Sequence, residues 1–234
     1  MIEGNIILVT GMSRGIGAAI AAKLEAEGAI VVGTARGKDF AETFNGEARQ
    51  RGSRSRVFET DVTDGAAVER LFQEIDRRYG RIDALVNNAG IAAFSPFLDT
   101  PAPTWKSVIE TNLTAVYEMT FHAVRRMVAV GNGQILFIAS DAAVRGIAQM
   151  AAYCASKHGV LGLARALQEE LQLTGIRIST LMPGPVSTTI LGSSSVSAEV
   201  LQPEDIAASV YHVLSLSRSA EIRELLIQPS RLTD

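Results

Sequence analysis

The sequence has little of several features that define specialised classes of protein. It contains one cysteine, Cys154, so neither a disulfide within the chain nor a cysteine-rich metal site can form. Its three histidines, His122, His158 and His212, are scattered without the spacing of metal ligands. We therefore expect neither a disulfide scaffold nor a metal, and a reducing compartment fits.

Long apolar runs and an excess of positive charge are also missing. No stretch approaches the roughly 18 apolar residues of a membrane span, and the N-terminal apolar run is too short for a signal peptide. The formal net charge is -3, whereas binding to nucleic-acid phosphates needs a basic surface. We expect a cytoplasmic protein without a membrane or nucleic-acid partner.

Apolar residues, in contrast, are plentiful and regularly arranged. They make up 47% of the 234 residues, which is typical of a protein with a large core. Short apolar runs alternate with longer amphipathic stretches, which predicts a single α/β domain over residues 1–234. Because strands with continuous apolar runs are buried on both faces, we expect a doubly wound parallel sheet covered by helices. A (β/α) barrel is the alternative, but it needs eight units and usually a longer chain.

The pattern predicts seven strands and six helices, with Asp64 as the N-cap of the third helix. The expected strands lie at 5–11, 29–35, 55–61, 82–90, 133–140, 175–184 and 221–229. The expected helices lie at 15–28, 40–52, 64–80, 103–131, 151–171 and 203–216. We interpret the stretch around 186–202 as a substrate loop within the same domain.

Three glycines follow the first expected strand directly, in the spacing TGxxxGxG. Gly11 would allow a tight turn, and Gly15 and Gly17 would let the backbone approach a pyrophosphate at a helix N-terminus. An ordinary glycine-rich turn is the alternative. The position between a strand and a helix favours a nucleotide site.

The end of the second expected strand bears on the choice of nucleotide. NAD-binding folds carry an acidic residue there that binds the ribose 2′-hydroxyl, but this chain has Ala35 and Arg36 instead. Arg36, with Arg14 in the glycine loop, could pair with a 2′-phosphate, although both could also be solvated surface arginines. The pair favours NADP(H) over NAD(H).

Two further strand ends carry polar residues. Asp61 is placed to contact an adenine edge, and a turn or capping role is the alternative. The NNAG stretch at 87–90 suits a backbone bend beside a ligand, although loop chemistry alone would also explain it.

Tyr153 and Lys157 lie four residues apart at the start of the helix expected at 151–171, so they share one face. A tyrosine pKa is about 10, and a nearby ammonium favours the phenolate, so we expect Lys157 to lower the pKa of Tyr153 toward that of a useful acid–base group. Ser140, at the end of the preceding strand, could hydrogen-bond a carbonyl oxygen that develops charge. Asn112 lies mid-helix, and we expect the helix to be disturbed there, with its side chain or a water reaching Lys157.

Together these residues resemble the short-chain dehydrogenase/reductase family over nearly the whole chain. The motifs that carry the likeness are the glycine motif at 10–17, NNAG at 87–90, NL at 112, Ser140, the YxxxK pair and PGPVST at 183–188. The resemblance implies a Rossmann-type fold, a nicotinamide cofactor and a catalytic set of Asn112, Ser140, Tyr153 and Lys157. It implies a cofactor site made of Gly11, Ser13, Arg14, Gly15, Ile16, Gly17, Arg36, Asp61, Val62, Asn88, Ala89, Gly90, Tyr153, Lys157, Pro183, Gly184, Val186 and Thr188.

The expected function is hydride transfer between NADP(H) and a small carbonyl or secondary alcohol, with Tyr153 as the acid–base group. The C-terminal segment from 203 onward is similar to a branch of NADP-dependent reductases that act on small hydroxy acids and related carbonyls. The alternatives are a 3-oxoacyl-[acyl-carrier-protein] reductase and a nucleotide-sensing regulatory protein without catalysis. The residues expected to border the substrate are Ser140, Ala142, Met150, Tyr153 and Ile190.

Small residues of the helix expected at 151–171 predict close packing on the sheet or on a second subunit. They are Ala155, Gly159, Gly162 and Ala166. The resemblance implies a homo-oligomer built on the two long central helices, and we expect a homotetramer or a dimer.

Overall fold

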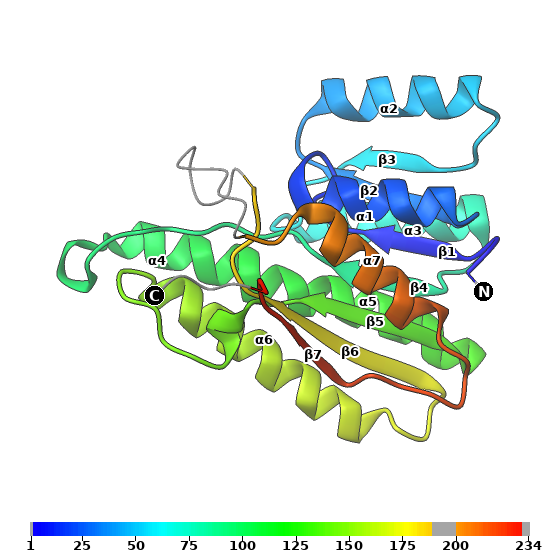
Figure 1. The fold of residues 1–234 in the computed structure, drawn as a ribbon. Helices are drawn as coiled ribbons and strands as arrows, with labels where there is room; N and C mark the ends of the chain where they lie inside the picture. The colour runs from blue at the N-terminus through cyan, green and yellow to red at the C-terminus, as the bar shows by residue number, and fades with distance from the viewer. Residues whose placement is uncertain (1, 189–199, 231–234) are drawn as a thin grey trace.

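One parallel sheet with helices on both faces forms the frame of the protein, as the computed structural model of residues 2–188 and 200–230 shows (Figure 1). In these residues the sheet has seven strands in the order β3-β2-β1-β4-β5-β6-β7, and all neighbours pair in parallel. The strands are β1 (Ile6–Val9), β2 (Ile30–Ala35), β3 (Arg56–Glu59), β4 (Ala84–Asn87), β5 (Gly133–Ile138), β6 (Ile176–Pro183) and β7 (Glu224–Ile227).

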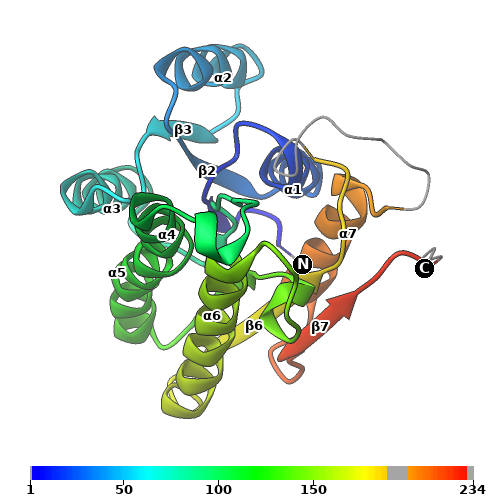
Figure 2. The ribbon, with the colours of Figure 1, turned by 90° about the vertical axis from the view of Figure 1, so that its left-hand side faces the viewer.

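The helices form two layers, one on each side of the sheet. Figure 2 shows α1 and α7 on one side of the sheet and α3, α5 and α6 on the other. The helices are α1 (Gly15–Ala26), α2 (Lys38–Gln50), α3 (Gly65–Tyr79), α4 (Ala102–Ile109), α5 (Ala115–Val130), α6 (Ala151–Glu170) and α7 (Pro203–Ser215). The doubly wound fold expected from the sequence is therefore confirmed, and the barrel alternative is wrong.

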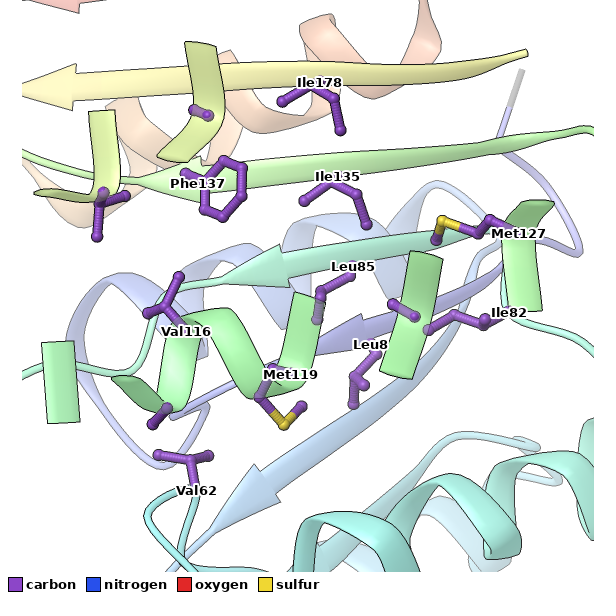
Figure 3. Close-up of a cluster of buried hydrophobic side chains, with 14 of the residues drawn as sticks. Leu8, Val62, Ile82, Leu85, Val116, Met119, Met127, Ile135, Phe137 and Ile178 are labelled. Atoms are coloured by element: carbon purple, nitrogen blue, oxygen red, sulfur yellow. The ribbon is translucent and has the colours of Figure 1, made fainter. Parts of the chain in front are cut away.

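The core lies between the sheet and these two layers. Alternate residues of a strand point to opposite faces, so Leu8 contributes to the cluster under α5 while its neighbours Ile7 and Val9 contribute to the cluster under α1 and α7. Figure 3 shows Leu85 and Ile135 on adjacent strands beneath α5. Strands buried on both faces explain why their sequences are continuous apolar runs rather than alternating ones.

Local chemistry fixes several helix ends as the sequence predicts. Asp64 caps α3, since its side chain accepts hydrogen bonds from the backbone N–H groups of Ala66 and Ala67. Gly80 ends α3 in the left-handed conformation, with φ of 71°. The long helix expected at 103–131 is instead two α-helices, α4 and α5, joined by a π-helical segment at Glu110–Thr114. The disturbance expected at Asn112 is thus present, because Asn112 lies inside this segment.

The strand order places a ligand crevice before any side chain is considered. The chain runs outward from β1 to β3 and then returns to β4 on the other side of β1, so the order reverses between β1 and β4. In doubly wound sheets, ligands bind outside the carboxyl ends of the strands at such a reversal. Among the residues that the structure describes, no helix is long and apolar enough to cross a membrane.

Candidate active site

A cavity of about 620 Å³ lies at the carboxyl ends of the strands. It is lined by the segments that follow β1 to β6, so residues far apart in the sequence meet there. From the sites expected at the sequence level, the cavity brings together Gly11, Ser13, Arg14, Gly15, Ile16, Gly17, Arg36, Asp61, Val62, Asn88, Ala89, Gly90, Ser140, Met150, Tyr153, Lys157, Pro183, Gly184, Val186 and Thr188.

The glycine loop after β1 requires its glycines for geometric reasons. Gly11 and Gly15 have φ of +67° and +56°, which side chains rarely adopt. At Gly17 a Cβ atom would lie 2.3 Å from the carbonyl oxygen of Gly11 and 2.5 Å from the amide nitrogen of Asn88. The start of α1 therefore packs directly under the loop, and its first residues, Gly15, Ile16 and Gly17, line the cavity. A helix N-terminus at that place suits an anion.

A threonine that the sequence reasoning missed ties this loop to the strand end of β4. The Thr10 hydroxyl accepts the backbone N–H groups of Asn88 and Ala89, both at 2.9 Å. In return the Asn88 amide donates to the carbonyl oxygens of Thr10 and Gly11, at 2.8 and 3.2 Å. The NNAG stretch is thus a brace for the glycine loop as well as part of the cavity wall.

The two arginines expected to read a 2′-phosphate both line the cavity and are exposed. Arg14 precedes α1 and Arg36 follows β2. Within the described residues, 2–188 and 200–230, neither Arg14 nor Arg36 forms an ion pair. Asp61 also lines the cavity, but its Oδ1 accepts from the Thr63 N–H and hydroxyl, at 2.9 and 2.8 Å. These bonds, together with the charge of Arg36, lower the pKa of Asp61.

Ser140, Tyr153 and Lys157 converge at the other end of the cavity. Ser140 follows β5 and begins a short turn, Asp141–Ala143, whereas Tyr153 and Lys157 lie one turn apart on α6. Lys157 is only 6% exposed, and its ammonium donates to the carbonyl oxygen of Ile138 at 2.9 Å. Burial lowers the pKa of Lys157 to about 8.

The expectation that Lys157 lowers the pKa of Tyr153 is wrong. Burial raises the pKa of Tyr153, the Ser140 hydroxyl acts in the opposite direction, and the charge of Asp141 raises the pKa further. The phenol loses water around its charged form, and the Lys157 ammonium, 5.6 Å from the ring centroid, is bonded to backbone instead.

Asn112 is fully buried and does not line the cavity; it braces the loop that does. Its side-chain oxygen accepts the Ile91 N–H and its amide donates to the Ile91 carbonyl, both at 2.8 Å. The same amide donates to Ser156 at 3.2 Å. With both ends of the amide used, the side chain does not reach Lys157, which corrects that part of the expectation.

The PGPVST stretch closes the cavity over the glycine loop. A methyl group of Thr188 lies 3.5 Å from where a Cβ of Gly15 would be. The Thr188 hydroxyl oxygen is buried and has no partner in the described part of the chain. A glycine cradle facing an unpaired hydroxyl on the same cavity fits a dinucleotide that ends in a carboxamide.

Of the expected substrate contacts, Met150 lines the cavity, whereas Ala142 is fully buried and does not. Ala142 instead donates its backbone N–H to the Ser140 hydroxyl oxygen at 3.2 Å. Ile190, and all of the expected substrate loop between 188 and 200, lies outside the described residues.

Charged cavity residues that the sequence reasoning passed over include Asp141 and Arg145. Asp141 follows Ser140 directly, and a buried carboxylate at a strand end could have been suspected from that adjacency. Other added lining residues are Ile91, Phe94, Ser107, Glu110, Thr111 and Ile147.

The sheet order, the glycine cradle and the Ser–Tyr–Lys group define an α/β oxidoreductase of the dinucleotide-binding class. The chain matches the family model described as short chain dehydrogenase over residues 5–198. It therefore belongs to the short-chain dehydrogenase family.

Relatives of known name extend over most of the chain. One is the 3-oxoacyl-[acyl-carrier-protein] reductase FabG of Haemophilus influenzae, 35% identical over 211 residues, which span 90% of this chain and 83% of the relative. A metagenomic short-chain oxidoreductase solved with NADP is 33% identical with a TM-score of 0.85, covering 99% of both chains. An alcohol dehydrogenase of Thermococcus sibiricus, solved with 5-hydroxy-NADP, is 28% identical with a TM-score of 0.91, again covering 99% of both chains.

Proposed function

We propose that the protein is an NADP(H)-dependent oxidoreductase that interconverts a small carbonyl compound and its secondary alcohol. The observation that carries the proposal is one cavity shared by Ser140, Tyr153 and Lys157 and by the glycine loop after β1. A nicotinamide bound there supplies the hydride, and the chain supplies orientation and proton transfer.

Tyr153 is the proton donor to the substrate oxygen in reduction and the acceptor in oxidation. It is half-buried on the cavity wall, next to Ser140, which is placed to hold the same oxygen. The Lys157 ammonium binds the nicotinamide ribose and, when a ligand draws it from Ile138, favours the tyrosinate. Asn112 acts through Ile91, whose backbone it holds at the cavity wall, and we retain its expected part in proton resupply as a proposal.

A preference for NADP(H) over NAD(H) rests on Arg14 and Arg36. Both are exposed on the cavity wall, and β2 ends in Ala35 where a carboxylate would bind the ribose of NAD. A guanidinium is the side chain best suited to a phosphate, because it offers several N–H donors in a fixed plane. The NADP in the metagenomic relative supports the same choice.

A 3-oxoacyl-[acyl-carrier-protein] reductase is the second candidate. The observation that favours it is the 35% identity to an enzyme of that name over 90% of this chain. Both candidates use the same cofactor and the same proton donor, so only the substrate separates them.

We also propose that the protein assembles as a homotetramer or dimer in the cytoplasm. Tyr117 and Phe121 on α5 are 54% and 45% exposed and stack with ring centroids 6.1 Å apart. Exposed aromatic pairs of this kind are typical of interfaces between subunits. Light scattering at micromolar concentration should give a mass of two or four chains of 24.9 kDa each, and the mass of a single chain would contradict the assembly.

One assay set tests the function. NADPH and NADH are compared over small ketones, β-keto acids and acyl thioesters, with the corresponding alcohols for the reverse reaction. We expect turnover with NADPH on a small carbonyl, and Tyr153→Phe should reduce it by about 10²–10⁴-fold while NADPH still binds. Tyr79→Phe, a matched change outside the cavity, should keep full turnover. Near-normal turnover in Tyr153→Phe would remove the assigned role, and a strong preference for NADH would overturn the assignment of the two arginines.

A further inference from the structure

A buried carboxylate lies beside the proposed catalytic group and is not explained by its role in folding. Asp141 is 4% exposed and directly follows Ser140. Burying a charge costs free energy unless it is paired and hydrogen-bonded. Arg145 supplies that pairing, since its Nη2 and Nε donate to Oδ2 of Asp141 at 2.6 and 2.9 Å. Gln228 donates to the same oxygen at 3.5 Å.

The other carboxylate oxygen is bonded to the proposed catalytic serine. Ser140 Oγ and Asp141 Oδ1 are 3.1 Å apart, and an ionised carboxylate can only accept, so the serine hydroxyl is the donor. The same Ser140 oxygen accepts the Ala142 N–H at 3.2 Å. The serine proton therefore points at Asp141.

We propose that Asp141, held by Arg145, is a positioning residue that fixes the direction of the Ser140 hydroxyl and supplies a negative charge that acts on the Tyr153 phenol. The charge of Asp141 favours the phenol over the phenolate, whereas the hydrogen bond with Ser140 acts in the opposite direction. Arg145 limits the effect of Asp141 by neutralising most of the carboxylate charge. The inference rests on the proposed function only for its consequence in catalysis, because the hydrogen bonds among Ser140, Asp141 and Arg145 are features of the structure itself.

Other titratable and charged groups around Tyr153 lie on α6 and on the remaining walls of the cavity. Lys157 on α6 is held by Ile138 at 2.9 Å, and Cys154 adjoins Tyr153 in the chain. The charged residues from the remaining cavity walls are Arg14, Arg36, Asp61 and Glu110. Burial raises the pKa of Tyr153 most, the hydrogen bond with Ser140 lowers it, and the negative charge of Asp141 raises it.

Opposite substitutions in the pair should move Tyr153 in opposite directions. Asp141→Asn removes the negative charge beside Ser140. If the amide oxygen of the new asparagine accepts from Arg145, the NH₂ group donates to the Ser140 oxygen. The Ser140 hydroxyl can then donate its proton to Tyr153. The tyrosine pKa should then fall by about one unit. Arg145→Gln leaves the carboxylate without its neutralising partner, so the tyrosine pKa should rise. Arg145→Lys keeps the positive charge but loses the second N–H donor to Asp141. The pKa of Tyr153 in this variant should stay close to that of the wild type.

Tyr153 can be titrated directly in the ligand-free protein. The chain has four tyrosines, so labelling them with ¹³C at Cζ gives four resonances, and Tyr153→Phe identifies the one from Tyr153. Tyr79 and Tyr211 serve as internal references whose titration should not move. Asp76→Asn is the matched control, because it removes an equal charge from an aspartate–arginine pair on the surface, with Arg126.

The same variants should move the pH profile for alcohol oxidation. The rise of kcat/KM with pH should shift to lower pH in Asp141→Asn and to higher pH in Arg145→Gln, each by the amount seen in the titration. An unchanged Tyr153 titration in both variants, or shifts in the same direction, would overturn the proposal even if activity falls. If Asp141→Asn fails to fold, the Arg145→Gln and Arg145→Lys pair decides alone, since the Arg145 side chain is 55% exposed. Absence of any turnover with NADPH would count against the proposed function, and the titration would still decide this inference.

Discussion

Lys157 and Tyr153 are neighbours that do not bond to each other: the ammonium lies 5.6 Å from the ring centroid and donates to the carbonyl oxygen of Ile138 at 2.9 Å. A buried cation with one backbone partner destabilises the fold, because most of its hydration is lost. The protein thus holds Lys157 at a cost in folding free energy that its proposed catalytic role explains and folding does not.

Replacing Lys157 by Met should therefore separate stability from activity. Folding lowers the pKa of Lys157 from 10.5 to about 8, so between these values the unfolded chain holds a proton that the folded protein releases. Stability from this group is lowest below pH 8 and is recovered as pH rises toward 10.5. Lys157→Met should be more stable than the wild type at pH 7, by up to about 3 kcal/mol, with turnover lost.

Thermal melts of the ligand-free proteins from pH 7 to 10 test this prediction. The gap between variant and wild type should narrow as pH rises. Lys106→Met, a change at an exposed lysine of α4, should show no such trend. A Lys157→Met protein that is less stable than the wild type at every pH would show that the bond to Ile138 outweighs the burial of the charge.

Gly17→Ala should disable nucleotide binding. The new Cβ would lie 2.3 Å from the Gly11 oxygen, a distance that backbone movement must relieve, and the Asn88 brace would move with it. We expect NADPH affinity to fall at least about tenfold, with stability reduced by about 1–3 kcal/mol. Gly46→Ala on α2 is the control: its Cβ meets nothing within 4 Å, so it should bind normally and melt slightly higher. Equal NADPH affinity in both variants would refute the close-packing argument.

Arg36→Ala should weaken NADPH without affecting NADH. A lost charge-assisted hydrogen bond to a phosphate is worth about 1.5–3 kcal/mol, which corresponds to about 10–100-fold in KM for NADPH. Arg49→Ala, at an exposed arginine of α2 outside the cavity lining, should change neither constant. Parallel increases in both KM values would mean that Arg36 contacts something other than the 2′-phosphate.

Asn112→Ala should destabilise the protein and loosen the cavity wall. It removes two hydrogen bonds of 2.8 Å to Ile91 and leaves a backbone N–H and C=O without their side-chain partner. The expected cost is about 2–4 kcal/mol in the free energy of unfolding, measured by denaturant titration. Because Ile91 lines the cavity, KM should rise together with the fall in kcat. A variant with wild-type stability would mean that the π-helical segment does not depend on this side chain.

Much of the frame follows from local pattern. The continuous apolar run of β1, the Asp64 cap and the glycines after β1 each act through neighbours within a few residues, so a sequence contains what is needed to predict them. The disturbance at Asn112 was likewise visible, since asparagine is a weak helix former in a long apolar helix. Its form as a π-helical segment was not, and neither was the contact of Asn112 with Ile91, 21 residues away.

The sequence alone determined the order of strands and helices, the position of the nucleotide loop and the residues placed to exchange a proton. Tertiary structure alone decided the electrostatics among them. The raised pKa of Tyr153, the lowered pKa of Lys157 and the Asp141–Arg145 pair behind Ser140 depend on which groups lose water and which charges meet. Desolvation and charge pairing act through space, and spacing along the chain carries no record of them until the sheet brings the strand ends together.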